Sequence, residues 1–124
     1  MSTRRSALVA DDDAVTRSFA ADVLGGLGLE VHEAADGVDA LRLYYARGPF
    51  ALFVTDVFMS RMGGPEVVEI LSARTTDMRV LFISAHNVGP LLGPTRRFLG
   101  KPFTARALRR EASRLLGEPA ELGG

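Results

Sequence analysis

Short, mostly apolar runs alternate along this chain with longer segments whose apolar residues recur at helical spacing, and this alternation limits the possible folds. A short run buried on both faces is typical of a parallel sheet covered by helices. Parallel strands need a crossover of about a dozen residues between them, which a helix usually fills. We therefore predict a doubly wound α/β fold with helices on both faces of the sheet. The expected strands are 7–10, 29–34, 50–55, 80–83 and a short fifth at 98–99.

Four of the segments around these strands predict full helices. Asp13 and Thr104 are suited to cap the first and the last of them, and Pro65 is favoured in the first turn of the third. Asp36-Gly37 predicts a turn before the second helix. The apolar residues at helical spacing are Phe19, Val23, Leu24 and Leu27; Val38, Leu41 and Tyr45; Val67, Ile70 and Leu71, expected to face inward; and Ala107, Leu108, Ala112, Leu115 and Leu116.

The connection between the fourth and fifth strands is unusually short. Thirteen residues separate Ser84 from Phe98, and two glycines and two prolines are among them. Proline and glycine both oppose a helix interior. We expect a fourth helix that is short or irregular.

Size and composition suit one domain. The 124 residues are 47% hydrophobic and 24% charged, with a net charge of zero. We expect a single domain over 1–124, with its core at about 6–116 and a tail at 117–124. No cysteine is present, which excludes disulfides and thiolate metal sites. No apolar run approaches the roughly 18 residues of a membrane span, and the N-terminus does not fit a signal peptide, so we expect a cytoplasmic protein without membrane partners. The charge is too weakly polarised along the chain to indicate nucleic-acid binding, so we expect no direct nucleic-acid partner.

Polar side chains follow the carboxyl ends of four of the expected strands. Asp11 and Asp12 follow the first, Asp56 the third and Ser84 the fourth, while Lys101, the only lysine of the chain, follows the fifth. Ligands of open α/β sheets bind beyond these strand ends. The five side chains are therefore expected to meet at one edge of the sheet.

The chemistry of this set indicates phosphoryl transfer. Three carboxylates close together raise each other's pKa unless a cation joins them. A donor set of oxygens alone favours Mg²⁺ over zinc. A carboxylate can also act as a nucleophile and form an aspartyl phosphate, with metal and ammonium neutralising the charge. The sequence predicts a Mg²⁺-dependent phosphoryl site.

Five motifs follow one another along the chain: Leu8-Val9-Ala10-Asp11-Asp12-Asp13, Ala35-Asp36-Gly37-Val38-Asp39-Ala40-Leu41, Val54-Thr55-Asp56, Ile83-Ser84-Ala85 and Lys101-Pro102-Phe103. In this order they resemble the receiver domains of two-component response regulators. The resemblance covers about residues 6–116 and implies a flavodoxin-like strand order 2-1-3-4-5. It leaves open a chemotaxis-type single-domain receiver or a hybrid-kinase-type receiver with a shortened fourth helix.

The resemblance also implies roles for individual residues. Asp56 would accept a phosphoryl group from the phosphohistidine of a sensor histidine kinase or a histidine phosphotransfer protein, and the switch could act on a downstream protein target. Asp12, Asp56 and the carbonyl of Phe58 would bind Mg²⁺ directly, and Asp11 would bind it through water. Ser84 and Lys101 would hold the phosphoryl oxygens. Phe98 matches the aromatic whose rotamer reports phosphorylation, although core packing also explains it.

Three departures from the family pattern bear on function. Ser60 stands where receivers commonly have proline, which predicts a less rigid loop after Asp56. Phe58 is bulky and could overhang the site and restrict the attacking water, and His86 lies near the mouth of the same site. The short fourth helix makes an ordinary output face doubtful and resembles receivers that relay phosphate.

Other functions remain open at this point. A degenerate receiver could act only as a protein-interaction module. An aspartate-nucleophile phosphatase would need a second aspartate where Phe58 stands. A flavodoxin-like mononucleotide binder would need a loop rich in Ser, Thr and Gly after the first strand, whereas this chain has Asp11-Asp12-Asp13. We expect a phosphoacceptor with slow self-dephosphorylation and no separate substrate.

Overall fold

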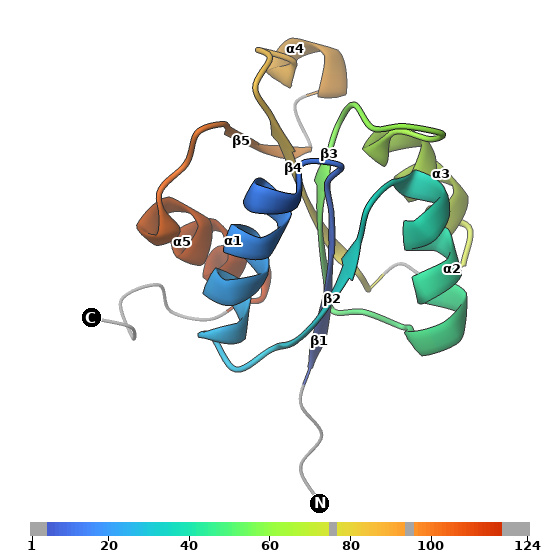
Figure 1. Ribbon diagram of the computed structural model, residues 1–124, viewed down its shortest axis with the longest axis horizontal. Coiled ribbons are helices and arrows are strands. Elements are labelled where there is room, and N and C mark those ends of the chain that lie inside the picture. The colour runs from blue at the N-terminus through green and yellow to red at the C-terminus, as the bar shows by residue number, and fades with distance from the viewer. Residues whose placement is uncertain (1–4, 75–76, 94–95, 118–124) are drawn as a thin grey trace, which may run out of the picture.

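A five-stranded parallel sheet runs through the middle of the molecule, with helices on both faces (Figure 1). The computed structural model describes residues 5–74, 77–93 and 96–117. Its strand order, β2-β1-β3-β4-β5, confirms the predicted doubly wound topology. From residue 118 onward the expected tail lies outside the described residues. The strands are β1 (Ser6–Ala10), β2 (Glu30–Ala34), β3 (Leu52–Asp56), β4 (Arg79–Ser84) and β5 (Arg97–Gly100).

Helices α1 and α5 pack against each other on one face of the sheet, and α2 and α3 pack together on the other (Figure 1). A short α4 projects beyond the strand ends. No helix in the described part of the chain is long and apolar enough to cross a membrane. The helices are α1 (Ala14–Gly25), α2 (Gly37–Arg47), α3 (Gly64–Ser72), α4 (Gly89–Leu92) and α5 (Ala105–Leu115).

Two apolar cores lie on the two faces of the sheet because successive strand residues point to opposite sides. Val9 and Val54 pack with Leu108 on the α1–α5 side. On the α2–α3 side, Leu8 and Phe53 belong to the second cluster. Each large apolar side chain that is fully buried contributes about 1.5–3 kcal/mol. Burial on both faces thus holds the central strands firmly, and it fixes the positions of the polar residues at their ends.

Side-chain caps begin three of the helices. The carboxylate of Asp13 accepts hydrogen bonds from the amide of Val15 (3.3 Å) and from the hydroxyl of Thr16 (2.6 Å), and the bond from Thr16 lowers the pKa of Asp13. Thr104 Oγ1 accepts from the backbone amide that is third in α5, at 3.0 Å. Both predicted caps are confirmed. Asp36, expected in a turn, instead caps α2 by accepting from the amide of Asp39 at 2.9 Å.

The inward face expected for α3 is right at two positions and wrong at the third. Val67 and Leu71 are fully buried, but Ile70 is 40% exposed. Val67 and Leu71 lie four residues apart and stack on one line of the helix, whereas Ile70 lies at the flank of that line. On the other helices, Phe19 and Tyr45 also remain partly exposed.

The fourth helix is a single turn, as its length and composition predicted. Gly89–Leu92 is helical over four residues and buries no side chain. Val88, which precedes it, is buried with Val57 and Phe82 in a small third cluster. This link therefore covers less of the sheet than a full helix would.

Candidate functional site

Three carboxylates meet at the carboxyl edge of the sheet. Asp11 and Asp12 follow β1, and Asp56 is the last residue of β3. One oxygen from each of them lies within 4.8 Å of the others. Asp11 is fully buried and Asp56 nearly so, while Asp12 is exposed. The structure thus brings these three carboxylates together, with one side of the cluster open to solvent.

Backbone and side-chain contacts fix Asp11 in this cluster. Its amide donates to the carbonyl of Ala34 at 3.1 Å, which joins it to the end of β2. Its Oδ1 accepts from the amide of Asp13 at 2.9 Å, and its carbonyl accepts from Nη1 of Arg17 at 2.9 Å. The buried carboxylate therefore has one oxygen occupied and the other directed at the cluster.

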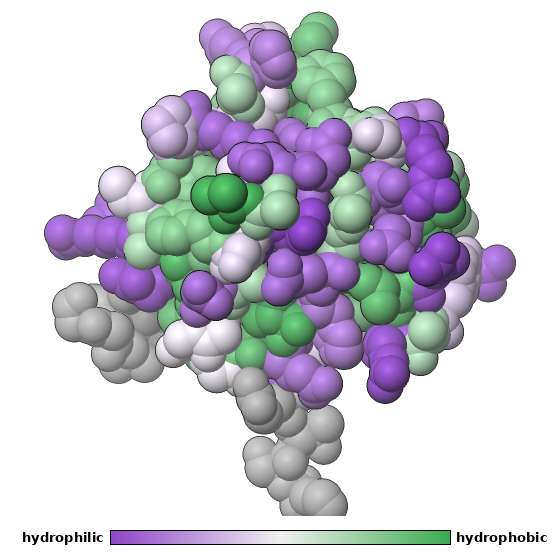
Figure 2. Space-filling model, viewed as in Figure 1, coloured by the Kyte–Doolittle hydropathy of each residue, from purple (hydrophilic) through white to green (hydrophobic). Residues whose placement is uncertain are grey.

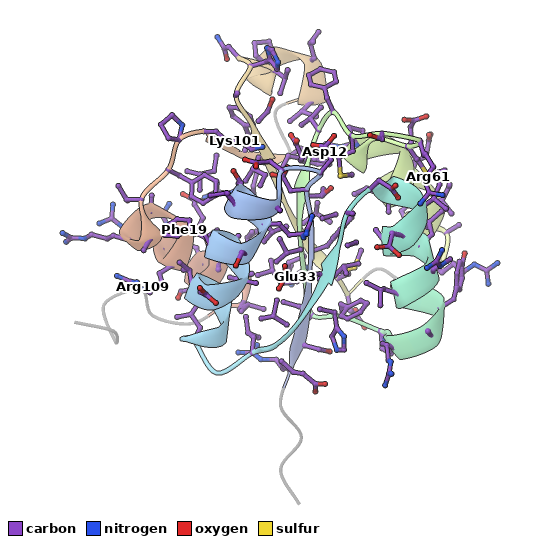
Figure 3. The ribbon with its side chains drawn as sticks, viewed as in Figure 1. Asp12, Phe19, Glu33, Arg61, Lys101 and Arg109 are labelled. Atoms are coloured by element: carbon purple, nitrogen blue, oxygen red, sulfur yellow. The ribbon has the colours of Figure 1, made fainter. Side chains whose placement is uncertain are left out.

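Lys101 brings its ammonium to two of the three carboxylates, and Figure 3 shows it at the same end of the molecule as the third, Asp12. Its Nζ lies 2.8 Å from Oδ2 of Asp11 and 3.3 Å from Oδ2 of Asp56. Its amide donates to the carbonyl of Ser84 at 2.8 Å, which extends the pairing of β4 and β5 past the strand ends. The only lysine of the chain is thus the cation of the site.

The charges at the site shift two pKa values. Burial, followed by the charge of Asp11, raises the pKa of Asp56, and Lys101 offsets only part of this. Burial alone would lower the pKa of Lys101, but its contact with Asp11 and the charges of both carboxylates raise it overall. The ammonium therefore stays charged, while an ionised Asp56 is held at a cost that a further cation would remove.

The residues present fit a hard divalent cation. Oδ2 of Asp11 is buried, and its partner among the described residues is the ammonium of Lys101, at 2.8 Å. Three carboxylates within reach of one point, one of them open to solvent, match the oxygen ligands and retained waters of Mg²⁺. Nitrogen or sulfur ligands, which zinc favours, are absent from the cluster.

Ser84 lies at the end of β4 and is almost fully buried. Its Oγ accepts a hydrogen bond from the amide of His86 at 3.0 Å. A serine hydroxyl that accepts one hydrogen bond still has its own proton to donate. The hydroxyl can therefore serve as a donor at the strand edge.

Two aromatic residues flank the site in different ways. Phe58, two residues past Asp56, is 55% exposed, and its ring stands edge-on to the imidazole of His86 with 5.5 Å between ring centroids. Phe98 pairs in register with Phe82 and packs, half-buried, against the cluster that contains Val57. Phe58 therefore faces solvent, whereas Phe98 packs into the third cluster.

One interaction near the site was not foreseen from the sequence. Arg61, in the loop between β3 and α3, forms a forked ion pair with Asp36, the cap of α2. The sequence showed Asp36 only as part of a turn, and 25 residues separate the partners. No local pattern in the sequence pairs Arg61 with Asp36; the structure shows that Gly37 packs closely under Met62, where only glycine fits.

An apolar hollow opens beside Lys101, between the start of α1 and the loop before α5. Its volume is about 280 Å³, and its apolar lining includes Val15, Phe19, Pro102 and Phe103. Val15 is 78% exposed. Figure 2 shows apolar side chains gathered over α1 on this face. Lys101 lines this hollow and also contacts two carboxylates of the cluster.

Comparison with known proteins gives a consistent result. The response regulator receiver domain family matches residues 7–113. The chain is 34% identical over 107 residues to the sensor kinase CckA of Brucella abortus, covering 82% of this chain and 11% of that protein. It is 35% identical over 106 residues to the response regulator MprA of Mycobacterium ulcerans, covering 82% and 45%.

The fold comparison agrees. The receiver domain of NtrX from Brucella abortus is similar with a TM-score of 0.79 and 27% identity, covering 92% of this chain and all of that one. The chain spans about a tenth of CckA and just under half of MprA. The match therefore concerns one domain of these longer proteins. By sequence and by fold, the chain belongs to the response regulator receiver domain family.

Proposed function

We propose that residues 6–116 act as the phosphoacceptor of a histidine–aspartate phosphorelay, with Asp56 as the residue that takes the phosphoryl group. The observation that supports this most directly is the ammonium of Lys101, in contact with Asp11 and Asp56 beside a third carboxylate. Such a cluster with one cation offers a nucleophile, metal ligands and a counter-charge within a few ångströms.

Four residues would hold Mg²⁺ in this proposal. Asp12, Asp56 and the backbone carbonyl of Phe58 would be direct ligands, and Asp11 would act through water. The buried Oδ2 of Asp11, which lies in the cluster with Asp12 and Asp56, supports its part in this set. When bound, the metal supplies charge neutralisation for the phosphoryl oxygens.

Asp56 would be the nucleophile. One carboxylate oxygen attacks phosphorus, the bond from phosphorus to the imidazole nitrogen of the donor breaks, and its electron pair stays on that nitrogen. Lys101 and the Ser84 hydroxyl would hold the transferred oxygens. The buried position of Ser84 and its free proton support this role. The raised pKa of Lys101 keeps its charge available throughout.

The hollow beside Lys101 would receive the phosphodonor, either a sensor histidine kinase or a histidine phosphotransfer protein. Lys101 lines the hollow and also contacts the cluster, and the apolar lining from α1 suits a protein surface better than a small anion. The one-turn α4 favours a relay over an output through a full fourth helix. Ser84 and Phe98 would report phosphorylation to the β4–β5 side, since Phe98 packs in the cluster that contains Val57, next to Asp56.

The test is incubation with Mg²⁺ and acetyl phosphate or beryllofluoride, followed by intact mass or NMR. We expect a Mg²⁺-dependent adduct at Asp56 that is lost in Asp56→Asn and in EDTA. A chain that forms no adduct would be a degenerate receiver that only binds partners, and the proposal would fall. Turnover of a generic phosphate ester, abolished by Asp56→Asn, would instead indicate a phosphatase.

A further inference from the structure

The loop that follows Asp56 is tied to the start of α2 by a two-point ion pair. Nε of Arg61 lies 2.8 Å from Oδ2 of Asp36, and Nη2 lies 3.1 Å from Oδ1. Figure 3 shows Arg61 beside the first turn of α2. A guanidinium that meets a carboxylate with both arms fixes direction as well as distance.

The backbone at Arg61 is in a conformation that needs such support. Its φ is +64°, and Arg61 is the only non-glycine residue with positive φ in the described part of the chain. The left-handed region is disfavoured for side chains with a Cβ, and it persists where surrounding contacts hold it. The forked pair with Asp36 is the contact in place to do so.

Close backbone packing joins this tie to the phosphoryl site. A Cβ on Gly37 would lie 2.2 Å from the carbonyl oxygen of Met62, so the loop rests directly on the first residue of α2. At the other end, a Cβ on Gly64 would lie 2.4 Å from the carbonyl oxygen of Asp56. The loop is therefore held between α2 and the end of β3, and Phe58 lies within that held stretch.

We infer that Arg61 is a positioning residue for the metal site: its pair with Asp36 holds the β3–α3 loop in the conformation that presents the Phe58 carbonyl. The inference rests on the proposed function, because it concerns the same Mg²⁺ site. The ion pair would also offset the less rigid loop expected from Ser60, because it restricts the loop conformation as a proline would. Arg61 acts through the backbone and touches none of the three carboxylates of the cluster.

The experiment compares Arg61→Gln with the wild type in a Mg²⁺ titration followed by ¹H–¹⁵N NMR, at a temperature where both are folded. We expect the Mg²⁺ Kd to rise about tenfold, the lower end of the effect of outer-shell partners on metal affinity. Amide exchange in residues 57–63 should also become faster. The matched control is Arg42→Gln, which breaks the ion pair of the exposed Arg42 with Asp39 (3.2 Å) on α2. This variant should leave the Mg²⁺ Kd unchanged.

Two further variants separate positioning from folding. Arg61→Gly removes the fork while accepting the positive φ without strain, so it should fold and still bind Mg²⁺ more weakly. Ser60→Pro in the Arg61→Gln background should restore much of the affinity by stiffening the loop. A change that only lowered stability would move Tm and leave Kd unchanged.

The outcomes are distinct. If the wild type forms no Mg²⁺-dependent adduct, the proposed function fails. If the wild type binds Mg²⁺ and both Arg61→Gln and Arg61→Gly bind it equally well, the function stands and the positioning role of Arg61 is overturned. Weaker binding in both variants, with Arg42→Gln unaffected, supports the role.

Discussion

The ring of Phe58 meets the imidazole of His86 edge-on, at 84° between planes and 5.5 Å between centroids. Phe58 belongs to the loop after β3, and His86 belongs to the loop after β4. This aromatic pair therefore bridges the two loops that flank Asp56. The pair lies on the solvent side of the site, because the Phe58 ring is more than half exposed.

Replacing Phe58 tests whether this bridge limits water. We expect Phe58→Asn to shorten the lifetime of the phosphorylated form by three- to tenfold, about 1 kcal/mol in the barrier, because the smaller polar side chain leaves room for an attacking water. The decay of the adduct after removal of acetyl phosphate, followed by intact mass, measures this. Phe58→Tyr keeps the ring and should decay at the wild-type rate. An unchanged rate in Phe58→Asn would refute the idea.

The raised pKa of Asp56 predicts a stabilising substitution. A carboxyl whose pKa is higher in the folded state binds its proton more tightly there, so ionising it costs stability at every pH above its folded-state pKa. In EDTA at pH 7.5, Asp56→Asn should raise Tm by about 2–6 °C, since about 1 kcal/mol corresponds to roughly 4 °C in a domain of this size.

The dependence of this increase in Tm on pH and on Mg²⁺ tests the prediction. The difference in Tm should shrink as the pH falls towards the ordinary value of 3.8, where the wild-type carboxyl is also protonated. Mg²⁺ should stabilise the wild type more than Asp56→Asn, because the ion binds only the folded site. A lower Tm for Asp56→Asn in EDTA at pH 7.5 would contradict the prediction.

The hollow beside Lys101 predicts a variant that separates two phosphodonors. Val15→Arg should slow phosphotransfer from an autophosphorylated histidine kinase that labels the wild type, because the cation enters an apolar contact. Labelling by acetyl phosphate should be unchanged. Leu91→Arg, which alters another highly exposed apolar residue on α4, is the matched control and should transfer normally. Equal loss with both donors would place the effect in the chemistry and not in docking.

Two glycines make opposite predictions for the same substitution. Gly37→Ala places a methyl 2.2 Å from the Met62 carbonyl oxygen, and we expect a loss of about 1–3 kcal/mol and weaker Mg²⁺ binding. Gly25→Ala meets nothing within 4 Å at the end of α1 and should be neutral or stabilise by about 0.4–1 kcal/mol. Chemical denaturation measures both, and equal effects would rule out the close approach as the cause.

The sequence predicted the sheet and its chemistry because both depend on short-range patterns. Each apolar run predicts a strand. The parallel arrangement then brings Asp11, Asp56 and Lys101 to the carboxyl edge of the sheet, however the helices pack. The site is therefore foreseeable from where the strands end.

The features that the sequence did not predict depend on contacts between segments far apart in the chain. The pairing of Arg61 with Asp36 needs the positive φ of Arg61 and the packing under Met62, and neither leaves a local pattern. The exposure of Ile70 follows from how α3 is rotated against its neighbours, which helical spacing leaves undetermined. The aromatic contact of Phe58 with His86 likewise arises only when the two loops are placed.

Because α4 is a single turn, the two sides of the site differ in how firmly they are held. Asp11 directly follows β1 and Asp56 ends β3, two strands enclosed on both faces. Lys101 instead follows the half-buried edge strand β5, which is reached through four helical residues. One helical turn has little cooperativity of its own, since nucleation is costly and few bonds follow it. We therefore expect the carboxylates to keep their positions when a phosphoryl group is added, and the loop that carries the ammonium of Lys101 to move instead.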